Sequence, residues 1–209
     1  VTSLSSELKN PSRFIGIHFF NPAPLMPLVE IIPGLLTKEN LAAEIFSLMK
    51  TWGKVSVIAK DVPGFIVNRI ARPFYGEALR IAEENIATFE QIDDAMRTLG
   101  NFKMGPFELM DLIGIDVNFS VTKTVYADYF YDPKYKPSLL QQRMSEAKLL
   151  GRKSGKGFYD YSEESKEPRT KNQDIKDEKL YEEIFLRIIS MLINEAVEAK
   201  RLGIASDEA

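Results

Sequence analysis

The sequence predicts a mainly α-helical protein whose N-terminal part is mixed α/β. Short apolar runs bounded by proline and glycine, which are typical of buried strands, occur in that N-terminal part. After Asp61 the apolar residues recur at helical spacing. A polar, charged stretch interrupts this pattern late in the chain and indicates a linker. We therefore expect an α/β portion over residues 1–60, a helical domain over 61–161, a linker over 162–177 and a further helical segment over 178–209.

Within the N-terminal part the pattern predicts three strands and two helices. A short helix around residues 4–8 is expected to stop at Pro11, because proline lacks the N–H that continues a helix. The expected strands cover residues 14–20, 28–32 and 55–59, and Thr37 is expected to cap a helix that runs to about Lys50.

The helical domain is expected to open with a turn at residues 61–64 that leads into a long helix. The apolar stripe of this helix comprises Phe65, Ile66, Ile70, Phe74, Leu79 and Ile81. Shorter helices are expected at about 88–99, 105–112, 115–130 and 137–148, and a final amphipathic helix at about 178–202.

An internal repeat joins the long helix to the final helix at a separation of 118 positions. Two unrelated amphipathic helices could resemble each other by chance. Here the matching pairs and the end of the helix stay in register, which favours a true second copy that breaks off after a few turns. The matches are Arg69-Ile70 with Arg187-Ile188, Glu77-Ala78 with Glu195-Ala196, and Ile86-Ala87 with Ile204-Ala205.

Composition narrows the possible functions. The formal charge is −3 and the basic residues are scattered, so no nucleic-acid partner is expected. The lack of cysteine excludes disulfides and thiolate chemistry, and one histidine argues against a histidine-based metal site. Neither a signal peptide nor an apolar run long enough to span a membrane is present, so we expect a cytoplasmic protein. The chain starts at Val1 rather than Met, and we expect both ends to be cuts.

His18 is the leading candidate for a catalytic base, because it is the only imidazole and imidazole titrates near neutral pH. It ends an apolar strand, and ligands gather at strand ends in α/β sheets. Glu30 lies within the next strand, where an unpaired carboxylate would be costly to bury, and its natural partner is His18. That contact would fix the imidazole tautomer. The alternatives are a structural buried histidine and an edge-strand carboxylate in water.

Asn68 is expected near the start of the long helix, where an amide could donate to a developing oxyanion. The alternative is a polar residue that solvates the helix end. The glycine-rich run at residues 151–157 suggests a phosphate cradle, but it lacks the spacing and the context of a P-loop. No G-x-G-x-x-G occurs, so the pyrophosphate-binding turn of a Rossmann domain is absent from this sequence.

Several motifs are more specific in combination than singly. They are His18-Phe19-Phe20-Asn21-Pro22, Leu28-Val29-Glu30-Ile31, Asp61-Val62-Pro63-Gly64-Phe65-Ile66-Val67-Asn68-Arg69, Met104-Gly105-Pro106-Phe107-Glu108-Leu109 and Gly155-Lys156-Gly157-Phe158-Tyr159-Asp160-Tyr161. With them the chain resembles the 3-hydroxyacyl-CoA dehydrogenase family over about residues 1–161, and its repeat resembles the duplicated form of that family.

The resemblance implies an all-helical domain like that of the 6-phosphogluconate dehydrogenases, preceded by the terminal α/β portion of a truncated Rossmann domain. It implies NAD as the cofactor of the parent enzyme, an acyl-CoA substrate and a homodimer formed through the helical domain. His18 would remove the 3-hydroxyl proton, Glu30 would orient and charge-balance His18, and Asn68 would hydrogen-bond near the reacting oxygen. A serine that the family uses should fall just before Val1, so that contact is missing, and no cofactor-binding residue is assigned.

We therefore expect part of an NAD-dependent 3-hydroxyacyl-CoA dehydrogenase that shows little turnover alone. One alternative is a non-catalytic helical association module. Another is the β-hydroxyacid or 6-phosphogluconate dehydrogenase group, which uses a lysine base on the long helix, whereas no lysine occurs here from residue 64 through 84. A substrate with a second carboxylate would need an arginine or lysine in the acyl pocket, for which Arg69 and Arg72 are candidates.

Overall fold

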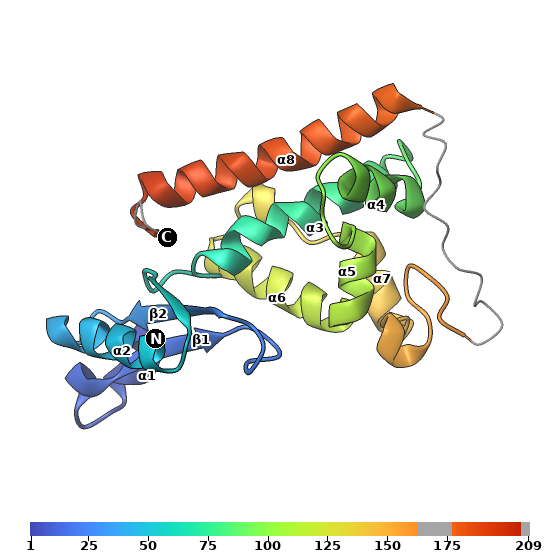
Figure 1. Ribbon diagram of the computed structural model, residues 1–209. Helices are drawn as coiled ribbons and strands as arrows, with labels where there is room; N and C mark the ends of the chain where they lie inside the picture. The colour runs from blue at the N-terminus through green and yellow to red at the C-terminus, as the bar shows by residue number, and fades with distance from the viewer. Residues whose placement is uncertain (163–176, 206–209) are drawn as a thin grey trace. The chain divides into compact units, whose positions relative to one another are not determined.

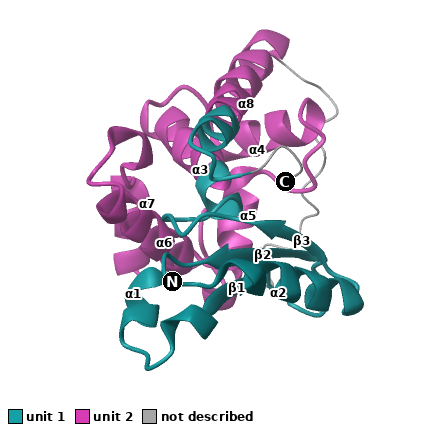
Figure 2. Ribbon diagram, turned by 90° about the vertical axis from the view of Figure 1, so that its left-hand side faces the viewer, with its two compact units in different colours: residues 1–70, 195–209 teal, residues 71–194 magenta. Residues whose placement is uncertain are grey.

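The computed structural model describes residues 1–162 and 177–205, and the chain divides into two compact units (Figures 1 and 2). Almost all of the predicted linker, residues 163–176, lies outside the described residues. The first unit comprises residues 1–70 and 195–209, and the second comprises residues 71–194.

The first unit is built on a sheet of three strands in the order β1-β2-β3. β1 is antiparallel to β2, and β2 is parallel to β3. The strands are rich in valine and isoleucine, whose branched side chains suit a buried pleated surface. The bounds are α1 (Thr2–Ser6), β1 (Ile15–Phe19), β2 (Leu28–Pro33), α2 (Glu39–Thr51) and β3 (Val55–Ile58), so the three strands are confirmed and the first helix ends well before Pro11.

Thr37 does not cap α2, contrary to expectation. The helix begins at Glu39 with Lys38 at its N-cap position and no side-chain cap. The Thr37 hydroxyl instead accepts a hydrogen bond from the N–H of Gly34 (2.8 Å) and donates to the carbonyl of Phe14 (2.7 Å). It closes the turn after β2, and a hydroxyl engaged in this way is not available to the helix.

The second unit is helical, and each helix predicted there is present with its ends within two residues of those expected. Phe65 and Ile66, expected on the apolar stripe of the long helix, instead precede its first residue, Val67. Three phenylalanine rings contact one another in its core, with centroids 4.6 to 5.1 Å apart: Phe89, Phe107 and Phe158. No helix among the described residues is long and apolar enough to cross a membrane. The bounds are α3 (Val67–Glu83), α4 (Phe89–Thr98), α5 (Pro106–Ile113), α6 (Ile115–Asp128), α7 (Leu139–Glu146) and α8 (Glu178–Arg201), where α3 and α8 each also supply residues to the first unit.

Two buried aspartates hold the loops of this unit to its helices. Each carboxylate accepts two consecutive backbone N–H groups and one tyrosine hydroxyl, which offsets the free energy of burying it. Asp93 accepts from Phe107, Glu108 and Tyr159, and Asp111 accepts from Phe158, Tyr159 and Tyr161. The glycine-rich run at residues 151–157 is therefore followed directly by the donors that bind Asp111. We call Asp111 with these donors a clamp, and it is not an open phosphate-binding loop.

Gly157 is the tightest point of this clamp. A Cβ atom there would lie 2.1 Å from Oδ1 of Asp111 and 2.6 Å from Cα of Gly151. Gly157→Ala should therefore displace Asp111 from its donors and lower the free energy of unfolding by about 2–4 kcal/mol. Thermal denaturation of the 209-residue chain should show a melting temperature lower by roughly 8 °C.

The matched control is Gly76→Ala in α3, where a Cβ would meet nothing within 4 Å. Alanine is the better helix former, so this variant should be neutral or slightly stabilised. Equal melting temperatures for the two alanine variants would show that the close approach at Gly157 does not affect the free energy of unfolding.

Candidate active site

β1 and β2 place His18 directly opposite Glu30. The two residues are register partners in an antiparallel strand pair, so their side chains emerge on the same face of the sheet. Nδ1 of His18 and Oε2 of Glu30 lie 2.6 Å apart. The contact expected from the order of the two strands is therefore present.

Glu30 is fully buried, with 0% of its surface exposed. Its second oxygen, Oε1, accepts the backbone N–H groups of Ile66 and Val67, each at 2.9 Å, where α3 begins. These donors and the positive end of the helix compensate the ionised carboxylate for its loss of water. The edge-strand alternative is wrong, because β2 is the middle strand of the sheet in the described part of the chain.

His18 is held on one side and accessible on the other. Its side chain is 30% exposed, and its ring lies beside those of Phe20 and Phe65, with centroids 4.8 and 5.7 Å away. Because an ionised Glu30 can only accept, Nδ1 carries the proton and Nε2 the lone pair. No hydrogen bond to Nε2 comes from the residues that the structure describes. The ring is therefore oriented as a base with its accepting nitrogen available.

Sequence reasoning missed the aromatic neighbours and the two backbone donors. Phe65 adopts a left-handed conformation (φ 48°), which is rare for a residue other than glycine. It directly precedes Ile66, the first donor to Glu30. The only local signal was Gly64 followed by an aromatic residue ahead of an apolar helix, and that signal does not name a partner.

Asn68 lies in the first turn of α3, which begins at Val67. This is the helix end whose backbone N–H groups bind Glu30. The structure thus brings all three predicted site residues, His18, Glu30 and Asn68, into the first unit. Their catalytic roles stay predictions.

Both arginines suggested for an acyl carboxylate are buried and hydrogen-bonded. Arg69 is 1% exposed and its Nε donates to Glu195. Arg72 is 7% exposed, donates to the hydroxyl of Thr122 (3.1 Å) and lies over the ring of Tyr75. Guanidinium groups that are buried and already hydrogen-bonded are poorly placed to bind an incoming carboxylate, and the suggestion stays a prediction.

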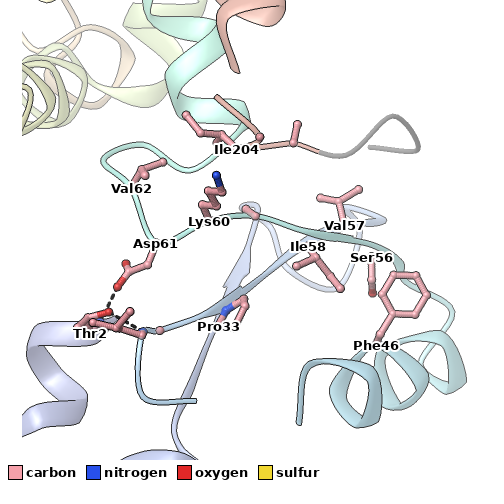
Figure 3. A pocket seen from close by; sticks show the side chains of 15 residues that line it. Thr2, Pro33, Phe46, Ser56, Val57, Ile58, Lys60, Asp61, Val62 and Ile204 are labelled. Atoms are coloured by element: carbon pink, nitrogen blue, oxygen red, sulfur yellow. Dashed lines mark hydrogen bonds between the residues drawn. The ribbon is translucent and has the colours of Figure 1, made fainter. Parts of the chain in front are cut away.

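A cavity of about 890 Å³ in the first unit does not coincide with these residues (Figure 3). The side chains of Phe46 and Ser56 lie on one side of it, and Thr2 and Asp61 on another, joined by a hydrogen bond from the Thr2 N–H. None of the three predicted site residues lines it. The groups suited to proton transfer, His18 and Glu30, lie instead where Glu30 accepts hydrogen bonds from the start of α3.

Comparison with known proteins decides the family. Residues 1–62 match the model of the 3-hydroxyacyl-CoA dehydrogenase NAD binding domain, and residues 64–161 match that of the 3-hydroxyacyl-CoA dehydrogenase C-terminal domain. The chain belongs to the 3-hydroxyacyl-CoA dehydrogenase family. The resemblance drawn from the motifs is thereby confirmed.

Individual relatives are considerably longer than this chain. It is 48% identical over 164 residues to the 3-hydroxyadipyl-CoA dehydrogenase of Escherichia coli (strain K12), a match covering 78% of this chain and 34% of the relative. It is 44% identical over 162 residues to the 3-hydroxybutyryl-CoA dehydrogenase of Clostridioides difficile, covering 78% and 57%. The chain thus spans between about a third and just over half of these relatives.

Solved structures show the same fold. The crystal structure of 3-hydroxybutyryl-CoA dehydrogenase from Escherichia coli K12 has a TM-score of 0.76 and 48% identity, covering 77% of this chain and 34% of that chain. The dehydrogenase part of multifunctional enzyme 1 from C. elegans has a TM-score of 0.58 and 26% identity, covering 98% and 48%. The second match therefore extends over α8 as well.

Proposed function

We propose that this chain supplies the base-bearing part of an NAD-dependent 3-hydroxyacyl-CoA dehydrogenase, which oxidises the 3-hydroxyl of an acyl-CoA to the 3-ketoacyl-CoA. The observation that carries the proposal is the arrangement of His18, Glu30 and the start of α3. A buried carboxylate, held by two backbone donors, orients an imidazole whose other nitrogen is accessible. Membership of the family supplies the class of reaction.

Oxidation of a secondary alcohol removes a proton from oxygen and a hydride from carbon. In the proposed reaction Nε2 of His18 accepts the hydroxyl proton, and Glu30 balances the positive charge that forms on the ring. Asn68 is proposed to hydrogen-bond near the reacting oxygen. NAD, when bound, supplies the hydride acceptor. The sequence contains no G-x-G-x-x-G turn for its pyrophosphate, so no residue here is assigned to the cofactor.

The first test compares this chain alone with the same segment placed inside a longer relative. We propose that residues 1–209 alone turn over 3-hydroxyacyl-CoA at least about 10³-fold more slowly than a chimera, because hydride transfer needs an oriented cofactor. In the chimera, the matching segment of this chain replaces 164 residues of the Escherichia coli relative. NADH formation is followed with 3-hydroxyadipyl-CoA and with 3-hydroxybutyryl-CoA.

A folded chimera that is inactive on both substrates would contradict the proposed reaction. Rapid turnover by residues 1–209 alone would instead contradict the proposal that activity needs the additional parts of the longer relatives. The ratio of kcat/KM for the two substrates also identifies the acyl group, for which the named relatives offer both adipyl and butyryl chains. A cytoplasmic location and a homodimer formed through the helical domain belong to the same proposal.

A further inference from the structure

Phe65 combines an unfavourable backbone conformation with a place beside the candidate base. Its φ of 48° lies in the left-handed region, which is disfavoured for a residue with a bulky side chain. Among the residues that the structure describes, Asn85 and Asn101 also have positive φ, and asparagine tolerates this conformation. Phenylalanine has no such local reason. Strained residues of this kind persist only where their surroundings hold them, and they gather at functional sites.

The ring of Phe65, and not the turn itself, is the feature that needs an explanation. Gly64 also has a positive φ (76°), and a Cβ atom there would lie 3.0 Å from the backbone nitrogen of Arg69, so the backbone requires glycine at position 64. At position 65 glycine would adopt the same conformation without strain. The chain nevertheless carries a phenylalanine there.

The turn at Phe65 directs the next two N–H groups to one carboxylate oxygen. Ile66 and Val67 both donate to Oε1 of Glu30 at 2.9 Å. Successive N–H groups in a turn with a left-handed residue form a concave site that suits an anion. The other oxygen of Glu30 lies 2.6 Å from Nδ1 of His18. The backbone conformation of Phe65 therefore affects the imidazole through Glu30.

The side chain of Phe65 lies beside the same imidazole. The centroids of the two rings are 5.7 Å apart, with 57° between the ring planes. Phe65 also packs against the buried apolar cluster of the first unit that contains Ile66. Because packing against a buried cluster restricts the motion of the phenyl ring, this ring is suited to limit the motion of its neighbour.

The hydrogen bond to Glu30 does not by itself fix the imidazole of His18. It determines where Nδ1 points, but the ring can still tilt about that bond, and Nε2 moves when the ring tilts. Nε2 is the nitrogen that the proposed reaction uses, and proton transfer requires it to stay within hydrogen-bond reach of the hydroxyl. The rings of Phe20 and Phe65, which lie beside the imidazole, oppose such a tilt by packing.

We propose that Phe65 is a positioning residue that holds the imidazole of His18 at one tilt. Its left-handed conformation allows one short turn both to present two donors to Glu30 and to place a ring beside His18. The strain is retained because glycine would supply only the first of these. The expected effect on turnover rests on the proposed function, whereas the expected effect on the mobility of the imidazole does not.

The test replaces Phe65 by glycine in the 209-residue chain, which removes the ring and keeps the left-handed backbone. His18 is the only histidine, so its ring can be followed alone in ¹³C-histidine-labelled protein. Relaxation of the ring C–H groups should give an order parameter of about 0.85 in the unaltered chain and below about 0.6 in the variant. The ring proton should stay on Nδ1 in both, because Glu30 keeps its donors.

The same substitution in the active chimera should lower kcat by about tenfold and leave KM within about twofold, because the base is present but less well oriented. Phe65→Tyr, which retains an aromatic ring, should keep the order parameter of His18 and should keep kcat within about threefold.

Phe130→Gly is the matched control. It makes the same substitution at another left-handed phenylalanine (φ 52°), which belongs to the second unit and is 91% exposed. It should change neither the order parameter of His18 nor kcat. A control that mobilised the imidazole as much as Phe65→Gly would refute a specific role for Phe65.

An unchanged order parameter in a folded Phe65→Gly variant would overturn the inference, whatever the activity of the chimera. A chimera that is inactive before any substitution would contradict the proposed reaction only, and the order parameter would then decide the inference alone. If Phe65→Gly does not fold, Phe65→Asn takes its place, since asparagine also tolerates the left-handed conformation. Failure of both variants to fold would show that the ring is needed for folding itself and would refute a positioning role.

Discussion

Replacing His18 by glutamine in the active chimera should lower kcat by roughly 10²- to 10⁴-fold, the range over which a positioned general base accelerates proton transfer. Glutamine is of similar size and can still hydrogen-bond to Glu30, but it has no nitrogen that takes up a proton near neutral pH. Because the His18 side chain is 30% exposed, the change leaves no large cavity and the melting temperature should barely move. Initial rates of NADH formation and a thermal melt measure the two quantities.

Lys38→Gln is the matched control, since it places the same side chain at an exposed position of the same unit. It should leave kcat unchanged. A His18→Gln chimera that retained its rate within about threefold would remove His18 from the proposed chemistry. The family assignment would be unaffected, because it does not rest on this residue alone.

Replacing Glu30 by glutamine is expected to invert the tautomer of His18. One oxygen of Glu30 accepts the N–H groups of Ile66 and Val67, so the single oxygen of glutamine has to take that place. Its NH₂ group then faces Nδ1 of His18 and donates to it, which moves the ring proton to Nε2. A ring protonated at Nε2 cannot accept the hydroxyl proton, and kcat should fall by about 10²-fold or more.

The tautomer can be observed directly, because His18 is the only histidine among the 209 residues. In ¹⁵N-histidine-labelled protein at alkaline pH, the nitrogen shifts should show the proton on Nδ1 in the unaltered chain and on Nε2 in the Glu30→Gln variant. Glu7→Gln, an exposed change of the same kind, should leave the spectrum as it was. If Glu30 had a merely structural role, its replacement would alter the melting temperature without exchanging the tautomers of His18. A folded variant whose ring proton stays on Nδ1 would therefore count against a positioning role for Glu30.

The site shares its construction with the two structural clamps of the helical unit. Glu30, Asp93 and Asp111 each accept two consecutive backbone N–H groups that follow shortly after a glycine, together with one side-chain donor. In the clamps the third donor is a tyrosine hydroxyl. At Glu30 it is the partly exposed imidazole of His18. The same arrangement thus anchors loops at Asp93 and Asp111, whereas at Glu30 it is a candidate for proton chemistry.

The sequence alone determined the elements and the family. Hydrophobic periodicity is a local property, so the strands near residues 14–20 and 28–32 and the helices of the second unit could be placed from it. The pairing of His18 with Glu30 was also accessible, because consecutive strands usually lie side by side. The motifs around both residues pointed to the correct family.

Only the tertiary structure decided which polar groups meet. Thr37 closes a turn instead of capping α2, and Arg69 is buried against a glutamate that lies 126 residues further along the chain. The backbone donors to Glu30 and the ion pair of Arg187 with Glu77 likewise join residues far apart in the sequence. Local periodicity predicts that a side chain is buried. The hydrogen-bond partner of that side chain depends on which distant segment packs against it, and a local pattern cannot predict that segment.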